Sequence, residues 1–297
     1  MHNGLNYFRV IKSYTMKNSI KTILAICVFA ISAISSAQKA PTFEKGNDPR
    51  PKDKKWKLVK NQSDEFKGSS LNKSKWVTGG GWIGRPPGLF MQDNIKVKDG
   101  SLKITAYTLP QPIVKNKKTF IHGGGYVGSV APSKYGYYEA RMKANKTFMS
   151  STFWLINEGR NESGCNKRTV ELDIQECVGE INTKGKWAQH FDRSMHSNTH
   201  SRNIPEGCDY VKGIKGTNTD LKEGMVYDDY HVYGAWWKSE TEVWFYLDGV
   251  LTEKVTPAAD FDINMHIRMV VETYDWNPVP ADGGMTGTEE ERTTSYD

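Results

Sequence analysis

The stretch Tyr135–Ala144, with the sequence YGYYEARMKA, alternates between two kinds of side chain. In a β-strand, successive side chains point to opposite faces of the sheet. One face of this stretch therefore carries Tyr137, Glu139, Arg141 and Lys143, and the other carries Tyr138, Ala140, Met142 and Ala144. This pattern predicts an antiparallel strand with one face on a hydrophobic core and one face toward solvent.

Strand patterns recur along the chain, and no helix pattern of useful length is present. Asp99-Gly100 and Asp248-Gly249 each separate two such patterns, and Asp-Gly favours a two-residue hairpin turn. The other predicted strands cover 149–156, 170–175, 231–237 and 266–273. Together these features predict an all-β sandwich of two curved antiparallel sheets, with a concave cleft that holds a polymer.

Four long segments without a strand pattern are predicted to be loops. Long loops in one compact domain usually shape a binding site. They are residues 108–120, 157–168, 201–224 and 276–294.

The N-terminal 37 residues have the pattern of a secretory signal peptide. A basic stretch that ends at Lys21 is followed by the apolar run 22–34 and by Ser35-Ser36-Ala37. Residues 1–15 are interpreted as an upstream extension, with translation starting at Met16. Residues 38–55, rich in Lys, Pro and Asp, are expected to be a solvated linker, and 56–297 the catalytic domain. We therefore expect a secreted protein, extracellular or periplasmic, that is monomeric and not membrane-bound after cleavage.

Charge and cysteine content add two constraints. The leader holds four Lys and Arg residues and no acidic residue, so its removal lowers the formal net charge from +6 to about +2. A nucleic acid partner is therefore not indicated. Cys165, Cys177 and Cys208 remain, and an oxidising compartment allows one disulfide with one thiol left over. The sequence does not choose the pair, and three buried free cysteines are the alternative.

Three acidic residues stand close together in Glu171–Glu176, ELDIQE. Glu171 and Asp173 share a face of a regular strand, whereas Glu176 would point away. A β-bulge between Asp173 and Glu176 adds one residue and returns Glu176 to the same face. Three carboxyl groups in a row cannot all ionise cheaply, so at least one pKa must rise. A retaining glycosidase needs this arrangement, with one carboxylate as nucleophile and one protonated acid. The alternative is an exposed acidic strand edge.

The pattern Glu-x-Asp-x-x-Glu resembles the bulged catalytic signature of glycoside hydrolase family 16. Further blocks agree in the same order: Asp64-Glu65-Phe66 with Lys75-Trp76, Lys134–Ala144, Trp236-Trp237 and Tyr246–Gly249. The resemblance runs from about residue 56 to the end. It implies a concanavalin-like jelly roll, with Glu171 as nucleophile, Asp173 as assistant and Glu176 as acid/base. It also implies that catalysis needs no metal or organic cofactor.

The flanking segments resemble the β-agarase and β-porphyranase group of this family. Trp82–Gly88 resembles a loop that covers the cleft, and Phe153–Leu155 a strand with a sugar-stacking Trp154. Met195-His196 resembles a His-bearing strand. Glu272–Trp276 resembles a strand end that contacts substrate. The expected substrate is therefore a red-algal galactan, cut at its β-1,4-galactosidic bonds.

Arginines favour porphyran over agarose in this group. Porphyran carries a sulfate on its L-galactose unit, and a guanidinium gives sulfate a rigid, positively charged fork. Arg85 lies in the cleft-covering loop between Trp82 and two prolines, and Arg168 precedes the catalytic strand. The alternative for both arginines is a charge that does not touch substrate, and the alternative enzyme is a β-agarase on neutral agarose.

Other candidate substrate-binding residues carry alternatives as well. Trp154 stacks on a sugar or belongs to the core, and His196 bonds a hydroxyl or is structural. Glu272 holds a hydroxyl or tethers a loop, and Trp276 is a further stacking candidate. The resemblance also implies a structural calcium ion, with the Gly100 carbonyl and the Asp297 carboxylate among its ligands.

One departure from the family concerns the C-terminus. Relatives continue after a Tyr-Asp pair with a strand that completes the sheet, whereas this chain stops at Tyr296-Asp297. Either the sequence is truncated or the last strand is absent, and a missing strand would leave an exposed edge. Two other classes of protein remain as alternatives: a non-catalytic carbohydrate-binding sandwich and a structural cell-surface sandwich without a sugar ligand.

Overall fold

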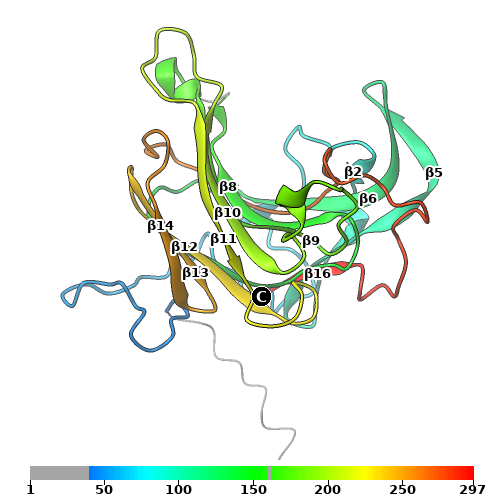
Figure 1. Cartoon of the computed structure of the whole chain (residues 1–297), viewed down its shortest axis with the longest axis horizontal. Coiled ribbons are helices and arrows are strands. Elements are labelled where there is room, and N and C mark those ends of the chain that lie inside the picture. The colour runs from blue at the N-terminus through cyan, green and yellow to red at the C-terminus, as the bar shows by residue number, and fades with distance from the viewer. Residues whose placement is uncertain (1–39, 160–161) are drawn as a thin grey trace, which may run out of the picture. The chain divides into compact units, whose positions relative to one another are not determined.

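The computed structural model describes residues 40–159 and 162–297, and the predicted signal peptide, residues 1–37, lies outside them. The described chain forms two mainly antiparallel sheets that face each other (Figure 1). Among these residues no helix is long and apolar enough to span a membrane. The predicted all-β sandwich is confirmed.

The larger sheet carries the acidic motif on β9. It has nine strands in the order β1-β6-β15-β8-β9-β10-β11, with β2 and β5 both paired to β6. Its strands are β1 (Trp76–Val77), β2 (Gly88–Phe90), β5 (Tyr107–Lys115), β6 (Lys118–Ser129), β8 (Ser150–Ile156), β9 (Thr169–Val178), β10 (Ser194–Arg202), β11 (Gly213–Asp220) and β15 (His266–Val271).

The smaller sheet has seven strands in the order β14-β13-β12-β7-β16-β4-β3. They are β3 (Ile95–Lys98), β4 (Ser101–Thr105), β7 (Gly136–Lys143), β12 (His231–Ser239), β13 (Glu242–Leu247), β14 (Val250–Val255) and β16 (Thr293–Tyr296). The described residues also form the short 3-10 helices η1 (Gln92–Asn94), η3 (Gly164–Lys167) and η4 (Lys186–Ala188).

The hydrophobic core lies between the two sheets. On β7 the expected alternation is present, because Tyr138, Ala140 and Met142 are buried in the main apolar cluster. Leu172 and Ile174 of β9 belong to the same cluster. Burying side chains of this kind stabilises a fold by roughly 1.5–3 kcal/mol each. The core therefore holds one face of β9 and leaves its other face for the cleft.

Both Asp-Gly hairpins form as predicted. Asp99 and Gly100 have φ angles of 56° and 78°, and Asp248 and Gly249 have 50° and 77°. A positive φ at both central residues is the turn geometry that matches the twist of paired strands.

The loop predicted for 108–120 is wrong, because β5 and β6 form a hairpin there. The segment contains Pro110 and Pro112, and proline lacks the N–H that a strand ladder needs. The register between β5 and β6 is irregular between Thr108 and Ile113, so both prolines lie where ladder bonds are missing. Within the described chain, β5 pairs only with β6, and a strand paired on one side tolerates this interruption.

The loop predicted for 201–224 is also partly wrong. Residues 201 and 202 extend β10, and residues 213–220 form β11 at the edge of the larger sheet. β11 is mostly polar and its Ile214 is exposed, so it has no apolar alternation that the sequence could reveal. In Figure 1, β10 and β11 rise together on one side of the larger sheet.

The described part of the segment 38–55, predicted to be a solvated linker, contacts the smaller sheet at Thr42 and Phe43. The Thr42 N–H donates to Glu139 Oε1 of β7 at 3.0 Å. The Phe43 ring lies 4.8 Å from the Tyr137 ring and 5.3 Å from the Tyr246 ring, centroid to centroid. This segment therefore packs on the outer face of the smaller sheet.

The last residues of the chain form a strand inside the smaller sheet. Residues 293–296, predicted as loop and terminus, form β16 between β7 and β4 in the middle of the smaller sheet. All four residues of β16 are buried.

Candidate active site

A bulge in β9 places the three acidic side chains on one face. Phe153 of β8 pairs with Gln175, and the next residue, Trp154, pairs with Asp173, so Ile174 is skipped. Ile174 joins the core, whereas Glu171, Asp173 and Glu176 all line one pocket. The predicted bulge and the common face of the three acids are therefore confirmed.

Gln175 supports the bulge on the side of β10. Its Oε1 accepts from the His196 N–H at 2.9 Å, and its Nε2 donates to the Ser194 carbonyl at 3.2 Å. The Ser197 hydroxyl donates to the Ile174 carbonyl at 2.7 Å. These side chains satisfy backbone groups that a regular ladder would pair, which a buried bulge requires.

Alternate residues of β10 face the acids. His196, Asn198, His200 and Arg202 are half-buried, and the residues between them are buried. Each acid has a partner in this row, because Asn198 bonds Glu176, His200 lies beside Asp173 and Arg202 bonds Glu171. Gly216 of β11 lies opposite Asn198, and a Cβ there would come within 2.2 Å of Asn198 Oδ1.

Glu176 has the electrostatics of a general acid. Burial, with a further contribution from Asp173, raises the pKa of Glu176 to about 8. The Tyr274 hydroxyl donates to Glu176 Oε1 at 2.8 Å and acts in the opposite direction. Asn198 Nδ2 donates to Glu176 Oε2 at 3.3 Å. At neutral pH Glu176 therefore holds a proton that it can give to a leaving group.

Asp173 lies between the other two acids. Burial, and then the charge of Glu171, raise the pKa of Asp173 well above its usual value, while Arg202 lowers it. His200 Nε2 lies 2.8 Å from Asp173 Oδ2, and burial lowers the pKa of His200. Both shifts favour uncharged forms, so this pair adds little negative charge beside Glu171.

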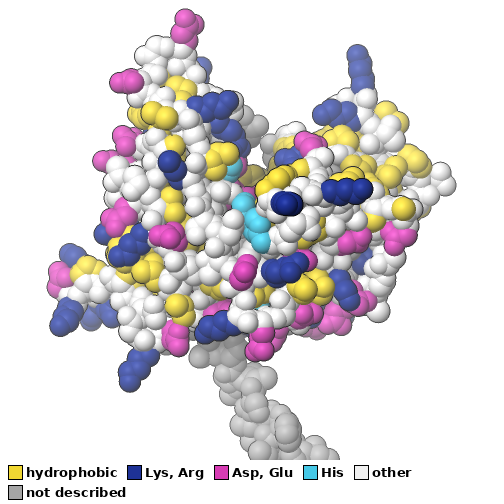
Figure 2. Space-filling model, viewed as in Figure 1, with side chains coloured by type: hydrophobic (Ala, Val, Ile, Leu, Met, Phe, Trp, Pro, Cys, Tyr) yellow, Lys and Arg dark blue, Asp and Glu magenta, His cyan; other side chains and the backbone are white. Residues whose placement is uncertain are grey.

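The walls of the pocket carry four of the predicted substrate-binding residues. Trp82, Arg85, Trp154 and Glu272 all line it. The Trp82 and Trp154 rings meet edge to face at 6.3 Å. Figure 2 shows a hollow between two raised parts of the surface, with histidine side chains near its floor.

Arg85 and Glu272 contact each other across the pocket wall. Arg85 Nη2 lies 3.6 Å from Glu272 Oε2, and the guanidinium lies 5.5 Å from the centre of the Tyr274 ring. Burial raises the pKa of Glu272 to about 8, although Arg85 opposes that shift. Glu272 is therefore a second carboxyl group that keeps its proton at neutral pH.

His196 and Trp276 lie behind the pocket wall. His196 Nε2 lies 2.9 Å from Asn198 Nδ2 and 3.9 Å from Glu176 Oε2. Burial lowers the pKa of His196 to about 4, so it is neutral. The Trp276 ring stacks on Tyr274, with centroids 5.2 Å apart. Both residues support side chains that reach the pocket.

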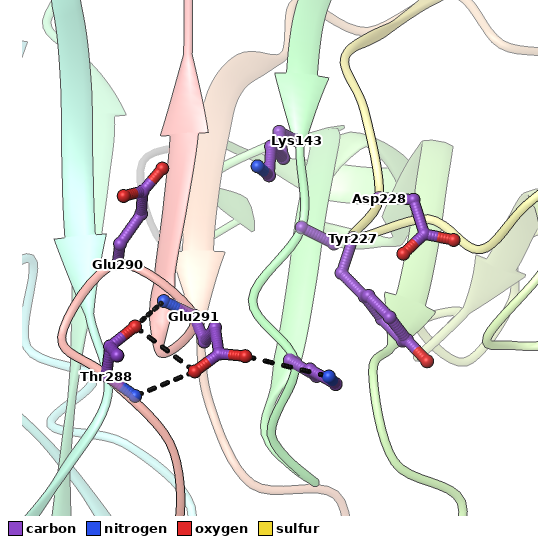
Figure 3. A pocket seen from close by; sticks show the side chains of 8 residues that line it. Lys143, Tyr227, Asp228, Thr288, Glu290 and Glu291 are labelled. Atoms are coloured by element: carbon purple, nitrogen blue, oxygen red, sulfur yellow. Dashed lines mark hydrogen bonds and ion pairs between the residues drawn. The ribbon is translucent and has the colours of Figure 1, made fainter.

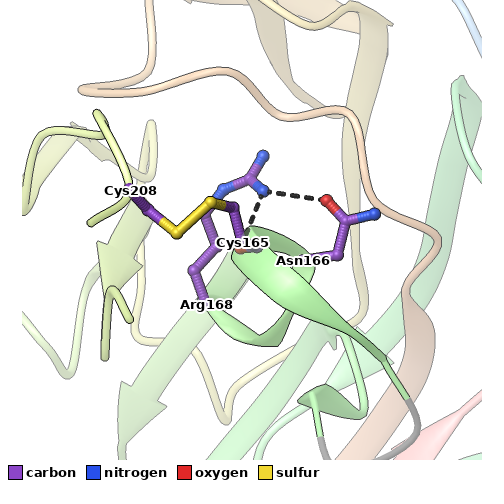
Figure 4. Close-up of a disulfide and its surroundings, with 4 residues drawn as sticks. All are labelled: Cys165, Asn166, Arg168 and Cys208. Carbon is purple, nitrogen blue, oxygen red and sulfur yellow. Dashed lines mark hydrogen bonds between the residues drawn. A yellow bond between two sulfur atoms is a disulfide. The ribbon is translucent and has the colours of Figure 1, made fainter. Parts of the chain in front are cut away.

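Arg168 is not at the cleft, contrary to one of the two predictions for it. Its side chain is fully buried, and its guanidinium pairs with Asp262 and lies 3.7 Å from the centre of the Tyr210 ring. Figure 4 shows the same guanidinium bonded near the disulfide between Cys165 and Cys208. Arg168 is therefore structural, because its side chain is fully buried and its charge is paired with Asp262.

The disulfide joins η3 to the loop after β10. It leaves Cys177 as a buried free cysteine, so one disulfide and one thiol are present among the described residues. The alternative of three free cysteines is wrong.

Of the two predicted calcium ligands, Gly100 and Asp297, the Asp297 carboxylate bonds other side chains. The Ser101 hydroxyl, adjacent to Gly100, donates to Asp297 Oδ1 at 2.7 Å. Arg141 Nη1 bonds Asp297 Oδ2. A guanidinium at this carboxylate competes with a cation, so the donor set does not fit a calcium ion well. The calcium site stays a prediction.

One group of side chains meets the geometry of a metal site in the described part of the chain. Ligand atoms of Glu171, Asp173 and His200 lie within 4.8 Å of one another. Arg202 already bonds both oxygens of Glu171. The positive charge in this group is thus supplied by arginine.

A second pocket, shown in Figure 3, contains no predicted site residue. In it Glu291 lies 3.6 Å from Lys146 Nζ and accepts from the Thr288 N–H at 2.8 Å. The chemistry of the chain is therefore concentrated in the pocket on β9.

Comparisons with known proteins point to one family. Residues 56–297 match the sequence family described as the glycoside hydrolase family 16 domain of β-porphyranases A–D. The chain is 59% identical to β-porphyranase B of Zobellia galactanivorans, over 95% of this chain and 96% of that protein. It is 34% identical to β-porphyranase B of Phocaeicola plebeius, over 83% and 84% of the two chains.

Solved structures agree. The crystal structure of porphyranase B from Zobellia galactanivorans matches with a TM-score of 0.85 at 62% identity, covering 86% of this chain and 96% of that chain. β-Agarase A from the same organism matches with a TM-score of 0.63 at 22% identity, covering 82% and 90%. The second match is a likeness of fold alone.

Proposed function

The chain belongs to the β-porphyranase A–D family of glycoside hydrolase family 16 domains, and we propose that it is an endo-acting hydrolase of porphyran. It cleaves β-1,4-galactosidic bonds of this sulfated galactan and retains the anomeric configuration. The observation that carries the proposal is the row of three acids in one pocket, in a chain 59% identical to a β-porphyranase. The N-terminal leader supports secretion, and we propose that the protein acts as a monomer.

Glu171 is the nucleophile in this proposal. Its carboxylate attacks the anomeric carbon, and the glycosidic bond breaks with its electron pair on the leaving oxygen. Glu176 gives its proton to that oxygen. The Glu176 carboxylate then takes a proton from water, which attacks the same carbon and releases Glu171. Two inversions at one carbon retain the configuration.

The pKa values support this division of roles. A pKa of about 8 keeps Glu176 protonated at neutral pH, before it meets a leaving group. Asp173 also favours its uncharged form and lies between the two. An acid with a raised pKa beside an ionised nucleophile is the combination that a retaining glycosidase needs.

Sulfate recognition is supported by two arginines in the pocket, Arg85 and Arg202. Arginine binds tetrahedral anions through two parallel hydrogen bonds. A second candidate, hydrolysis of neutral agarose, is favoured by Trp82 and Trp154, because flat rings pack on apolar sugar faces in the absence of charge.

Digestion of porphyran and agarose side by side tests the proposal. We expect sulfated oligosaccharides from porphyran with the β-anomer formed first, read by proton NMR. Exclusive cleavage of agarose would favour the second candidate, and an initial α-anomer would exclude the double displacement. Glu171→Gln should abolish turnover while porphyran binding survives. Unchanged turnover in this variant would remove Glu171 from its role.

A further inference from the structure

Arg202 holds the proposed nucleophile by both of its oxygen atoms. Nη1 donates to Glu171 Oε1 at 2.9 Å, and Nη2 donates to Glu171 Oε2 at 2.6 Å. Two parallel bonds are the strongest arrangement between a guanidinium and a carboxylate. The Glu171 side chain is only 12% exposed, so little water competes for it.

This contact opposes the reaction proposed for Glu171. A nucleophilic carboxylate must direct an oxygen lone pair at the anomeric carbon. A guanidinium bonded to both oxygens occupies one lone pair on each and stabilises the carboxylate before the reaction. Stabilising the ground state alone raises the barrier of the chemical step. The free enzyme therefore holds its nucleophile in a capped form.

Arg202 is placed so that it can exchange partners. It is the last residue of β10, its side chain is 35% exposed, and it lines the same pocket as the acids. The other arginine of the pocket, Arg85, is held less closely, with carboxylate contacts of 3.6 Å and 3.9 Å.

A sulfate ester is a suitable new partner for the guanidinium. It carries negative charge on several oxygens, and two of them match the arginine fork as a carboxylate does. A neutral galactan offers only hydroxyl groups, which compete poorly with an ionised carboxylate for a guanidinium. Sulfated and neutral chains should therefore differ in their effect on Glu171.

We propose, on the basis of the porphyranase function above, that Arg202 is a specificity-determining residue. In the free enzyme it caps Glu171, and in the complex its guanidinium moves to a sulfate ester of the bound galactan. The sulfate thus frees the nucleophile, whereas a neutral chain leaves it capped. The departure of Arg202 also removes a positive charge that lowers the pKa of Asp173.

The kinetic test uses Arg202→Gln and Arg202→Lys with porphyran and agarose oligosaccharides of equal length. For the wild-type chain we expect kcat/KM to favour the sulfated substrate. In Arg202→Gln the ratio of the two kcat/KM values should fall at least tenfold, because the sulfated substrate loses its anchor and the neutral one meets an uncapped nucleophile. Lysine, which lacks the fork, should give an intermediate ratio.

Arg193→Gln is the matched control, since Arg193 is an exposed arginine that pairs with Asp192. Its ratio should equal that of the wild type. A merely structural role of Arg202 would lower both kcat/KM values by one factor and leave the ratio unchanged, and that result would overturn the proposal. Failure of the wild-type chain to cut porphyran at all would instead overturn the proposed function.

A structural test does not depend on activity. A crystal structure of Glu176→Gln, which retains Glu171, is determined with a bound porphyran oligosaccharide. Arg202 bonded to a sulfate oxygen, with Glu171 released, supports the proposal. Arg202 still bonded to both Glu171 oxygens in that complex refutes it.

Discussion

The hydrogen bond from Tyr274 to Glu176 should set the alkaline limit of activity. The Tyr274 hydroxyl donates to Glu176 Oε1 at 2.8 Å, and this bond stabilises the ionised carboxylate. Tyr274→Phe removes the donor and retains the ring that stacks on Trp276. The ionised form of Glu176 then loses a partner, so the pKa of Glu176 should rise above about 8.

The size of this rise follows from the charge on the acceptor. A hydrogen bond to a charged group contributes about 1.5–3 kcal/mol. One pKa unit corresponds to about 1.36 kcal/mol at 25 °C, so we expect an increase of about one to two units. Activity requires protonated Glu176 and is lost as pH rises through its pKa. The alkaline limb of the profile should therefore move to higher pH by the same amount.

The assay is kcat/KM on porphyran between pH 5 and pH 10, measured by the release of reducing ends. Tyr230→Phe is the control, because Tyr230 lies against Arg141 at 4.1 Å and not in the pocket. The control should keep the wild-type profile. An alkaline limb that stays in place, or moves to lower pH, in Tyr274→Phe would refute the reasoning.

Three further predictions concern stability. Glu272→Gln should raise Tm at pH 9 and leave it unchanged near pH 4. Ionising a buried carboxyl with a pKa of about 8 costs folding free energy as pH rises, and the Gln variant avoids that cost. Calorimetry at both pH values checks this, and equal Tm changes at the two pH values would contradict it. Arg168→Met should cost about 3 kcal/mol without changing the ratio of rates on porphyran and agarose, and a changed ratio would place Arg168 at the substrate. Replacing Cys165 and Cys208 by Ser should lower the free energy of unfolding in urea by on the order of 3–4 kcal/mol, because the disulfide closes a loop with a sequence separation of 43. An unchanged urea midpoint would show that the disulfide does not restrain the unfolded chain.

Strands with a buried face or an Asp-Gly turn were readable from the sequence, and β5 and β11 were not. β7 carries strict alternation, and both Asp-Gly turns need a positive φ that few other dipeptides accept. β11 is mostly polar and its Ile214 is exposed, and β5 contains two prolines, so neither shows the pattern that burial imposes. The conformation of β11 is set by its pairing with β10, and that of β5 by its irregular pairing with β6.

The acids of the site could be predicted because the bulge is local to β9. Their partners come from other strands, and only tertiary pairing shows which of them meet. Asn198, His200 and Arg202 follow His196 at every second position, a signal that alternation alone could have revealed. The assumption that 201–224 is a loop hid Arg202. Tyr274 carries no such signal, because it reaches Glu176 across a sequence separation of 98.

Because Ile174 is skipped in the pairing of β9 with β8, this strand can be one residue shorter and still present its three acids to the pocket. Without Ile174, simple alternation would still send Glu171, Asp173 and Glu176 to the groove, and Gln175 would take the inward position. An in-frame loss of one codon is therefore compatible with the chemistry, provided that an apolar residue replaces Gln175. Descendants of such an enzyme can exchange a longer strand for a shorter one while the reaction continues.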